Sequence, residues 1–380
     1  MKQLVLAGAG HAHLHVLKAL AERPWAGVEV TLISPYPRQI YSGMLPGWMA
    51  GHYRLDQCAA VLKPLLAAAG VRFVQDSVVG LDAPRRAIQT LNHGEIAYDA
   101  LSLDTGAEVE LSALAATDAT LLSIRPIEDF VVGWTRQLEV FKQRGVASLA
   151  VVGGGAAGVE LALAARYRLT RELDASKVLV KLVGGGILPG HGPSIVARVT
   201  KALVRHRIEF VKGYASGCLS GLELHDGTTV PVNCIIAATG VSPAIWLADS
   251  GLTLAPDGFI AVQDGQQSVS HPQVFAAGDV ASRIDAPHAK SGVYAVRAGP
   301  VLARNLNLVL TGQEPLSYQP QKRSLYLLAT GPKEAIMSWG RFSASGRWAW
   351  LWKDRIDRRF MRQYEINPTS GAEEKTQPGS

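Results

Sequence analysis

The chain has 380 residues, of which 48% are hydrophobic and 18% are charged, and its formal net charge is +6. This size and composition exclude a disordered or coiled-coil protein and favour two or three globular domains. The three cysteines, Cys58, Cys218 and Cys234, lack disulfide-framework and metal-ligand spacing, so neither disulfides nor a zinc site are expected. No uncharged stretch is long enough and sufficiently free of glycine to predict a membrane span.

The chain begins with a predicted strand, residues 4–7, that enters a glycine turn with the sequence GAGHAH at residues 8–13. Backbone N–H groups at the start of the following helix can bind a pyrophosphate, and glycine lets the phosphates approach. His13 stands where the G-x-G-x-x-G pattern has its third small residue. The next predicted strand ends at Ser34 instead of an acidic residue for ribose. Alone, this turn is weak evidence for a dinucleotide site.

The same unit recurs in the middle of the chain. Residues 149–152 predict a strand, and residues 153–158 continue it with the complete pattern GGGAAG before a helical run. A strand that runs into Thr-Gly follows each glycine turn, at residues 100–106 and again at 235–240. The repeated order predicts a duplicated nucleotide-binding unit.

The second strand of the repeated unit, residues 178–183, ends at Gly184. A glycine there supplies neither a carboxylate for ribose hydroxyls nor a cation for a 2′-phosphate. The sequence therefore does not distinguish NADH from NADPH.

A third motif, VFAAGD at residues 274–279, completes an order that resembles the pyridine nucleotide-disulfide oxidoreductase superfamily. Within it the chain looks like type II NADH dehydrogenases and sulfide:quinone reductases. It is most similar to the flavoprotein that occurs alone or fused to selenide, water dikinase. That narrower resemblance rests on YSGMLPG at residues 41–47, GVYAVR at 292–297 and WKDRIDR at 352–358.

The resemblance implies an α/β fold with two Rossmann-like, three-layer ββα dinucleotide-binding domains and a small α+β C-terminal domain. The expected parts are a first FAD-binding part (1–115), an NAD(P)H-binding domain (116–240), a second FAD-binding part (241–317), a C-terminal domain with an amphipathic helix (318–366) and a flexible tail (367–380).

The resemblance also implies that FAD lies along the first unit. Gly8 and Gly10 would meet its pyrophosphate, Asp279 its ribitol and Val78 its adenine, while the helix after Ser291 would point its N-terminus at the flavin. The expected FAD-binding residues are Gly8, Ala9, Gly10, His11, Ala12, His13, Ser34, Val78, Thr105, Gly106, Gly278, Asp279, Ser291, Gly292 and Val293.

NADH or NADPH is implied at the second unit, where Glu160 would approach the nicotinamide amide. The alternative for Glu160 is an ion pair with Arg166 or Arg168 on its own helix. No side-chain acid or base is required, because the flavin does the chemistry; Glu160 and Lys290 are the candidates if one acts. The expected residues are Gly153, Gly155, Ala157, Gly158, Glu160, Gly184, Thr239 and Gly240.

Two further patterns have simpler readings. His11 and His15 are four residues apart, as metal ligands on a helix are, but a role of His11 as a hydrogen-bond donor beside a pyrophosphate suffices, and no metal is expected. Tyr41, Trp48 and Tyr53 either line the flavin or pack in the core. The segment from Tyr41 to Tyr53 lacks the cysteine pair of disulfide reductases, so thiol catalysis is not expected.

The C-terminal region predicts two strands, at residues 324–331 and 335–340, and then a helix with Trp348, Trp352, Ile356, Phe360 and Tyr364 as one apolar stripe. Residues 341–364 hold seven basic and two acidic side chains, a composition typical of a helix that lies in a membrane interface. The alternative is that the stripe packs on the sheet or on a second subunit.

These patterns predict an FAD-dependent oxidoreductase that takes hydride from NAD(P)H and passes electrons to a small-molecule acceptor, a quinone above all. The alternatives are a reductase of a selenium or sulfur compound and a non-enzymatic flavin- or nucleotide-binding partner protein. The expected location is cytoplasmic, with contact to the cytoplasmic face of the inner membrane through residues 341–364. A homodimer stays open, and no nucleic-acid partner is expected.

Overall fold

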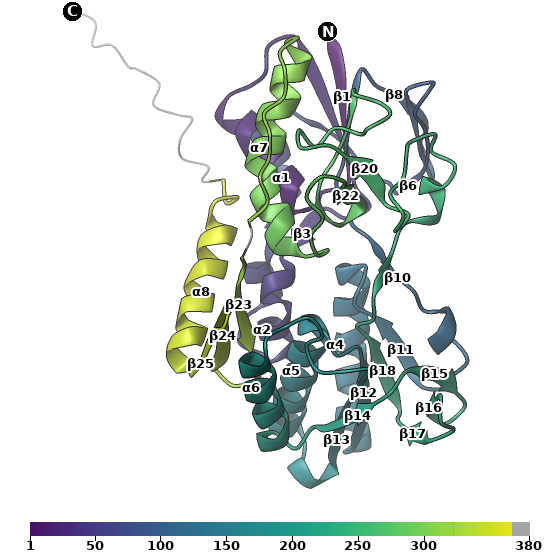
Figure 1. The fold of residues 1–380 in the computed structure, drawn as a ribbon, viewed down its shortest axis with the longest axis vertical. Helices are drawn as coiled ribbons and strands as arrows, with labels where there is room; N and C mark the ends of the chain where they lie inside the picture. Colours follow the sequence, from purple (N-terminus) through teal and green to yellow (C-terminus); the bar gives the residue numbers. More distant parts are fainter. Residues whose placement is uncertain (322, 367–380) are drawn as a thin grey trace, which may run out of the picture.

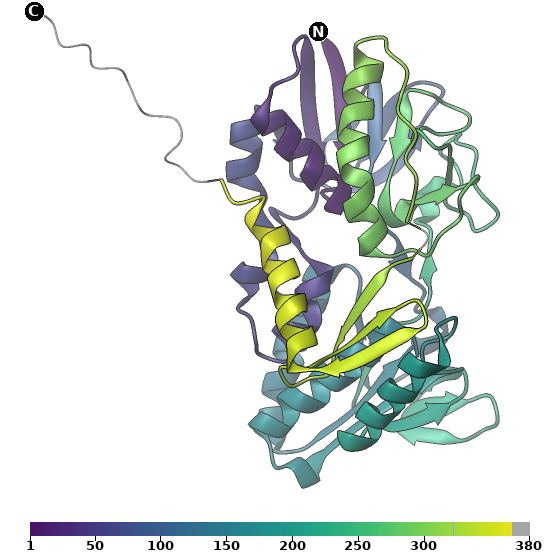
Figure 2. The same cartoon turned by 60° about the vertical axis from the view of Figure 1, so that its left-hand side comes forward.

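The computed structural model describes residues 1–321 and 323–366. The tail expected at residues 367–380 lies outside the described part. Figure 1 shows two α/β units stacked along the long axis of the molecule, with the C-terminal hairpin and helix α8 along one side. Figure 2 shows from a second angle that these C-terminal elements lie against both units.

The first unit is built on a parallel sheet with the strand order β21-β9-β1-β2-β5. Its strands are β1 (Lys2–Ala7), β2 (Val28–Ile33), β5 (Arg72–Val74), β9 (Ala100–Leu103) and β21 (Val274–Ala276). The strands read as nearly continuous apolar runs because both faces of the sheet are covered. One face packs against helices α1 (His11–Glu22), α3 (Leu62–Ala69) and α7 (Gly292–Leu310). The other packs against the antiparallel strands β6 (Val78–Asp82), β7 (Ala87–Thr90) and β8 (Gly94–Ala97).

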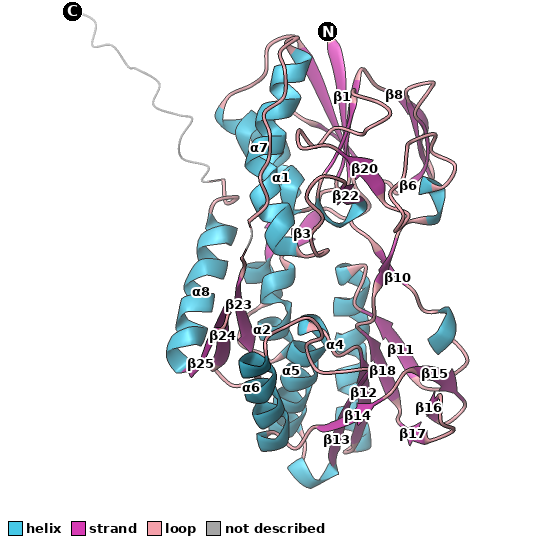
Figure 3. Ribbon diagram, in the orientation of Figure 1, coloured by secondary structure: helices cyan, strands magenta, loops and turns pink. Residues whose placement is uncertain are grey.

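The second unit repeats this plan, with the strand order β11-β18-β12-β13-β14. Its parallel strands are β11 (Thr120–Ser123), β12 (Ala147–Val152), β13 (Val178–Gly184), β14 (Glu209–Lys212) and β18 (Cys234–Ala237). Helices α4 (Ile127–Arg144), α5 (Ala156–Glu172) and α6 (Pro193–Arg205) cover one face. The antiparallel strands β15 (Ala215–Cys218), β16 (Gly221–Leu224) and β17 (Thr229–Pro231) cover the other. Figure 3 shows the resulting layers, and the predicted three-layer ββα fold is confirmed.

Short paired strands connect these parts. Strands β10 (Glu108–Val109) and β19 (Val241–Ser242) pair where the chain passes between the two units. In the first unit, β3 (Arg38–Ile40) pairs with β4 (Ala59–Val61), and helix α2 (Leu45–Met49) lies between them in sequence. Strand β20 (Ile260–Val262) pairs with β22 (Ala281–Arg283) beside the last strand of the first sheet.

The C-terminal elements are a three-stranded antiparallel sheet and one helix. They comprise β23 (Leu325–Ala329), β24 (Ala335–Trp339), β25 (Phe342–Gly346) and α8 (Arg347–Arg362). The sequence predicted only the first two strands, and β25 falls inside the basic segment that was expected to be helical. Residues 342–346, FSASG, form a strand because they pair with β24 in a hairpin, and small residues in a short run do not announce such a pairing.

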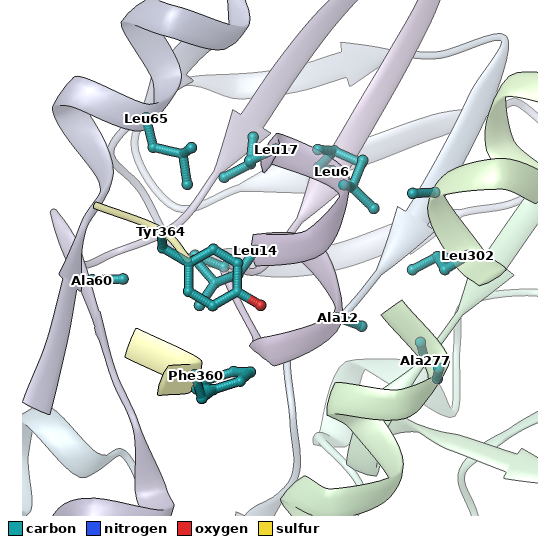
Figure 4. Close-up of a cluster of buried hydrophobic side chains, with 14 of the residues drawn as sticks. Leu6, Ala12, Leu14, Leu17, Ala60, Leu65, Ala277, Leu302, Phe360 and Tyr364 are labelled. Atoms are coloured by element: carbon teal, nitrogen blue, oxygen red, sulfur yellow. The ribbon is translucent and has the colours of Figure 1, made fainter. Parts of the chain in front are cut away.

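The expected single apolar stripe on the C-terminal helix is wrong. Trp348, Trp352 and Ile356 are exposed, whereas Phe360 and Tyr364 are buried. Each step of four residues turns the helix by about 400°, so Phe360 faces another side of α8 than Trp348, and Tyr364 lies beyond the end of the helix. Figure 4 shows Phe360 and Tyr364 directed at helix α1, within the core of the first unit.

None of the helices within residues 1–321 and 323–366 is long and apolar enough to cross a membrane.

Candidate functional site

The residues expected to bind FAD gather at one edge of the first sheet. Strands β1, β2, β9 and β21 are parallel, and each ends one or two residues before a predicted residue. These ends carry Gly8, Ser34, Thr105 and Gly278. In open α/β sheets, ligands bind outside the carboxyl ends of the strands, and the topology brings these four residues together at such an edge.

The turn after β1 is held by the buried residues His13 and Asp104. The Nδ1 atom of His13 lies 2.5 Å from the Gly8 carbonyl oxygen, and its Nε2 atom lies 2.8 Å from the Ser102 hydroxyl oxygen. Burial lowers the pKa of His13 to about 4, so the imidazole is neutral, donates from Nδ1 and accepts from Ser102. The His13 backbone N–H donates to Asp104 Oδ2 at 2.9 Å. The ring nitrogens and the backbone N–H of His13 therefore all bind other groups of the protein, and these bonds hold the turn in place.

Asp104 fills the space beside the second glycine of the turn. A Cβ on Gly10 would overlap the Asp104 carboxylate, so this glycine is required by a side chain of the protein itself. Burial raises the pKa of Asp104 to about 7, so the carboxyl is only partly ionised at neutral pH. Asp104 therefore repels an anion at the start of α1 less than a fully ionised carboxylate would.

The edges of the two sheets meet at an ion pair. Arg125 follows β11 in the second unit, and its Nη2 atom lies 2.6 Å from Asp279 Oδ2, which follows β21 in the first. His11 is buried nearby. Burial has the largest effect on its pKa and lowers it to about 4, while Asp279 raises the pKa and Arg125 lowers it. Its Nε2 atom has no hydrogen-bond partner among the described residues.

These groups fit FAD. An orphaned, neutral histidine nitrogen can donate to a phosphate or ribitol oxygen, and the Arg125 guanidinium supplies the positive charge that a pyrophosphate needs. The N-cap residue of helix α1 is Gly10, which has no side chain to cap the helix, so its first N–H groups are left for a ligand or for Asp104.

The other expected FAD residues are placed as follows. The Ser34 hydroxyl donates to the Tyr36 carbonyl at 3.3 Å. Val78 begins β6 and is half-buried. Ser291 is the N-cap residue of helix α7, Gly292 lies beside the Ser42 hydroxyl, and Val293 is exposed. The Lys290 ammonium donates to the Ala281 carbonyl at 2.6 Å and to the Ser282 hydroxyl at 2.8 Å.

The glycines of the second turn have two different roles. A Cβ on Gly153 would overlap the Ala238 carbonyl oxygen, and a Cβ on Gly158 would overlap that of Gly153, so both glycines are needed for folding. A Cβ on Gly155 would meet nothing within 4 Å. That open space at the uncapped start of α5 is where a pyrophosphate can approach.

The rest of the second site follows the same sheet edge. Ala157 lies in the first turn of α5, and Gly184, Thr239 and Gly240 lie at the ends of β13 and β18. The Thr239 hydroxyl is buried without a hydrogen-bond partner among the described residues. An orphaned hydroxyl beside an open glycine cradle fits a nicotinamide dinucleotide.

Glu160 lies in a buried cluster that joins α5 to the C-terminal elements. Its Oε1 atom accepts the Ala329 N–H at 2.7 Å, and burial raises its pKa to about 7. Lys353 on α8 donates to the Gly43 carbonyl at 2.6 Å and to Asp357 Oδ2 at 2.7 Å. The alternative ion pair of Glu160 is wrong, because Arg168 pairs with Glu172 and Arg166 binds carbonyl oxygens.

The histidines and aromatic residues of the first unit pack together. The Tyr41 ring lies 5.4 Å from His11 and 4.4 Å from Phe360, between centroids. His15 lies 5.6 Å from Tyr364. Among the described residues no group of three or more side chains could hold a metal ion. Trp48 packs in the core, and the Tyr53 hydroxyl donates to Asp354 at 2.7 Å.

Sequence reasoning missed Asp104 and Arg125. A signal for Asp104 was present, because the two copies of the unit differ at two linked positions. The first has His13 and Asp104 where the second has Gly158 and Ala238. In the second unit Gly158 lies against Ala238. In the first unit both members of this contact are larger, His13 and Asp104, which indicates that the two positions changed together. Arg125 gave no comparable signal, because its contact with Asp279 depends on how the two units are placed.

Comparisons with known proteins agree with this geometry. The pattern of the family described as pyridine nucleotide-disulphide oxidoreductase matches residues 2–299. The ferredoxin–NAD(+) reductase component of the p-cumate 2,3-dioxygenase system of Pseudomonas putida is 28% identical over 294 residues, which cover 74% of this chain and 68% of that protein.

Two solved structures share the fold over nearly the whole chain. The sulfide:quinone oxidoreductase of Aquifex aeolicus superposes with a TM-score of 0.79 at 18% identity, covering 96% of this chain and 91% of that one. The NDH2 of Plasmodium falciparum, solved in complex with NADH, also has a TM-score of 0.79, at 14% identity, covering 96% of this chain and 97% of that one.

Proposed function

The chain belongs to the pyridine nucleotide-disulphide oxidoreductase family, and on that premise we propose that it is an NAD(P)H dehydrogenase that delivers electrons to a quinone at a membrane surface. FAD and NADH or NADPH are its cofactors, as the two glycine turns predict. The observation that carries the proposal is the meeting of the two sheet edges at Arg125 and Asp279. Two dinucleotide sites that open toward one another suit hydride transfer between their ligands.

Each site has groups for its ligand. In the first, the N–H groups at the start of α1, the His11 ring and Arg125 would hold the pyrophosphate of FAD, and Asp279 its ribitol. In the second, the space at Gly155 and the start of α5 would hold the pyrophosphate of NAD(P)H. Bound FAD supplies a ring that accepts hydride and passes electrons on. The start of α7 places a positive dipole end beside Ser42, where it would favour an anion.

A quinone is the proposed acceptor because of the exposed side of α8. Trp348, Leu351, Trp352 and Ile356 are exposed on this helix. Exposed arginines lie between and beside them, at positions 347, 355, 359 and 362. Exposed tryptophan beside arginine suits a membrane interface, which is where quinones are found. The solved neighbours include one named for its quinone, the sulfide:quinone oxidoreductase.

The rival acceptor is a selenium or sulfur compound, suggested by the resemblance to the flavoprotein fused to selenide, water dikinase. A thiol mechanism has little support among the described residues. Burial raises the pKa of Cys58 to about 12 and raises that of Cys234 further, which disfavours the thiolate needed for attack.

The experiment is a screen of acceptors. FAD-loaded protein is reduced by a limiting amount of NADPH without oxygen and then mixed with a soluble quinone, a ferredoxin, selenite, polysulfide or oxygen. Reoxidation is expected to be fastest with quinone, and to survive replacement of Cys58, Cys218 and Cys234 together by serine. Faster reoxidation by ferredoxin, selenite or polysulfide would overturn the choice of acceptor.

A further inference from the structure

The adenosine of a coenzyme at the second site would lie beside the ends of β13 and β14. Gly184 ends β13 and is aligned with Lys212 at the end of β14. The Gly213 N–H donates to the Gly184 carbonyl at 3.0 Å, which holds the two strand ends together. The loop after Gly184 also packs on the glycine turn, since a Cβ on Gly154 would overlap the Gly186 carbonyl oxygen. A dinucleotide that starts at this turn therefore reaches the ends of β13 and β14 with its ribose and adenine.

An aromatic residue, Tyr214, follows the end of β14. The Tyr214 side chain is 70% exposed and lies next to Gly185, just after the end of β13. A Cβ on Gly185 would lie 3.1 Å from the Tyr214 hydroxyl oxygen, so the absence of a side chain makes room for the ring. The His225 ring lies 6.0 Å from that of Tyr214, between centroids, and the His225 backbone N–H donates to the Tyr214 carbonyl at 3.2 Å.

A basic residue, Lys212, lies two positions before this ring at the end of β14. Lys212 is exposed and makes no ion pair with any residue in the described part of the chain. The Asp226 carboxylate, one residue after His225, accepts the Thr228 N–H at 3.0 Å. The ends of β13 and β14 thus bring a lysine and an aromatic ring together in sequence, and Gly184 supplies no carboxylate to bind ribose hydroxyls.

We propose that Tyr214 and Lys212 read the adenosine end of the coenzyme: the Tyr214 ring stacks on adenine, and the Lys212 ammonium pairs with a 2′-phosphate, so that NADPH is preferred over NADH. Specificity is carried by the third strand of the sheet because the second strand ends in glycine. This inference rests on the proposed use of a nicotinamide dinucleotide at the second site. A single exposed lysine gives a preference of about tenfold or less, because solvent screens its charge.

The test is calorimetric binding of 2′,5′-ADP and 5′-AMP to the FAD-loaded protein at low salt, which needs no turnover. The wild type is expected to bind 2′,5′-ADP more tightly. Lys212→Glu should reverse or abolish this preference through a loss of about tenfold for 2′,5′-ADP alone. Tyr214→Ala should weaken both nucleotides by about tenfold, because stacking on adenine does not depend on the phosphate.

The matched control is Lys177→Glu, which makes the same charge change at the opposite end of β13, roughly 20 Å away along the strand. It should leave the preference unchanged. Equal affinities in the wild type, an unchanged preference in Lys212→Glu, unchanged affinities in Tyr214→Ala, or no binding of either nucleotide would each overturn the inference. Binding as expected without flavin reduction by NADPH would instead refute the proposed function and leave this adenosine site standing.

Discussion

The His13 ring of the first unit stands at the position of Gly158 in the second, with its Nδ1 atom 2.5 Å from the Gly8 carbonyl oxygen. In the second unit a Cβ at Gly158 would overlap the corresponding carbonyl oxygen of Gly153. One unit therefore avoids this carbonyl with glycine, and the other binds it with an imidazole. The departure from the glycine pattern at His13 is therefore a substitute contact.

Restoring the pattern should for that reason harm the protein. His13→Gly leaves the Gly8 carbonyl and the Ser102 hydroxyl without their buried partner and opens a cavity, at a cost on the order of 2–4 kcal/mol in the free energy of unfolding. His13→Gln can still donate to the carbonyl and should recover part of the loss. Denaturant unfolding with excess FAD measures both. A His13→Gly variant as stable as the wild type would contradict the contact.

The same histidine predicts a pH dependence. Its pKa is about 4 in the folded protein, below the ordinary value of 6.5, so between these values the unfolded chain takes up a proton that the folded chain does not. Stability contributed in this way is present above pH 6.5 and is lost as the pH falls toward 4, by on the order of 2–3 kcal/mol. The difference in unfolding free energy between wild type and His13→Gln should therefore change between pH 7 and pH 4.5. A pH-independent difference would show that His13 is not buried and neutral.

The glycines of the second turn should separate folding from coenzyme binding. Gly155→Val enters open space, so the variant should fold and retain FAD, yet block the approach of the pyrophosphate and abolish flavin reduction by NADH and NADPH. Dithionite, which needs no coenzyme site, should still reduce its flavin. Gly158→Ala, in contrast, should destabilise the second unit because its Cβ overlaps a carbonyl oxygen. Normal reduction of Gly155→Val by NADPH would place the coenzyme elsewhere.

Helix α8 allows the membrane proposal to be tested without damage to the core. Trp352→Glu lies on the exposed side, so it should release the protein from anionic liposomes and slow quinone reduction while flavin reduction by NADPH continues. Leu91→Glu, which replaces an exposed apolar residue in the turn between β7 and β8 of the first unit, is the matched control and should bind like the wild type. Phe360→Glu should unfold the protein because its ring is buried.

Liposome flotation at low and high salt gives the readout for these variants. Binding of the wild type should fall steeply with salt, since each basic side chain near the surface contributes about 1 kcal/mol. A wild type that ignores anionic liposomes at low salt would refute membrane contact through α8.

The sequence was informative where structure is local. A strand, a glycine turn and a helix follow one another within about 20 residues, so both dinucleotide units could be predicted from spacing. The contact of Arg125 with Asp279 joins positions 154 residues apart, and that of Lys353 with Gly43 joins positions 310 apart. Such contacts depend on how the units pack, which periodicity does not encode. The end of the apolar stripe at Phe360 was misread for the same reason, because burial there is decided by α1.

The most direct measurement is anaerobic stopped-flow mixing of the purified, FAD-loaded protein with NADPH and, separately, with NADH. The account predicts that the protein retains FAD without a covalent bond, that its oxidised flavin absorbance is lost promptly with either coenzyme, and that a quinone restores it. Asp279→Ala should hold FAD more weakly. A protein that does not take up FAD, or whose bound FAD neither coenzyme reduces, would contradict the central claim.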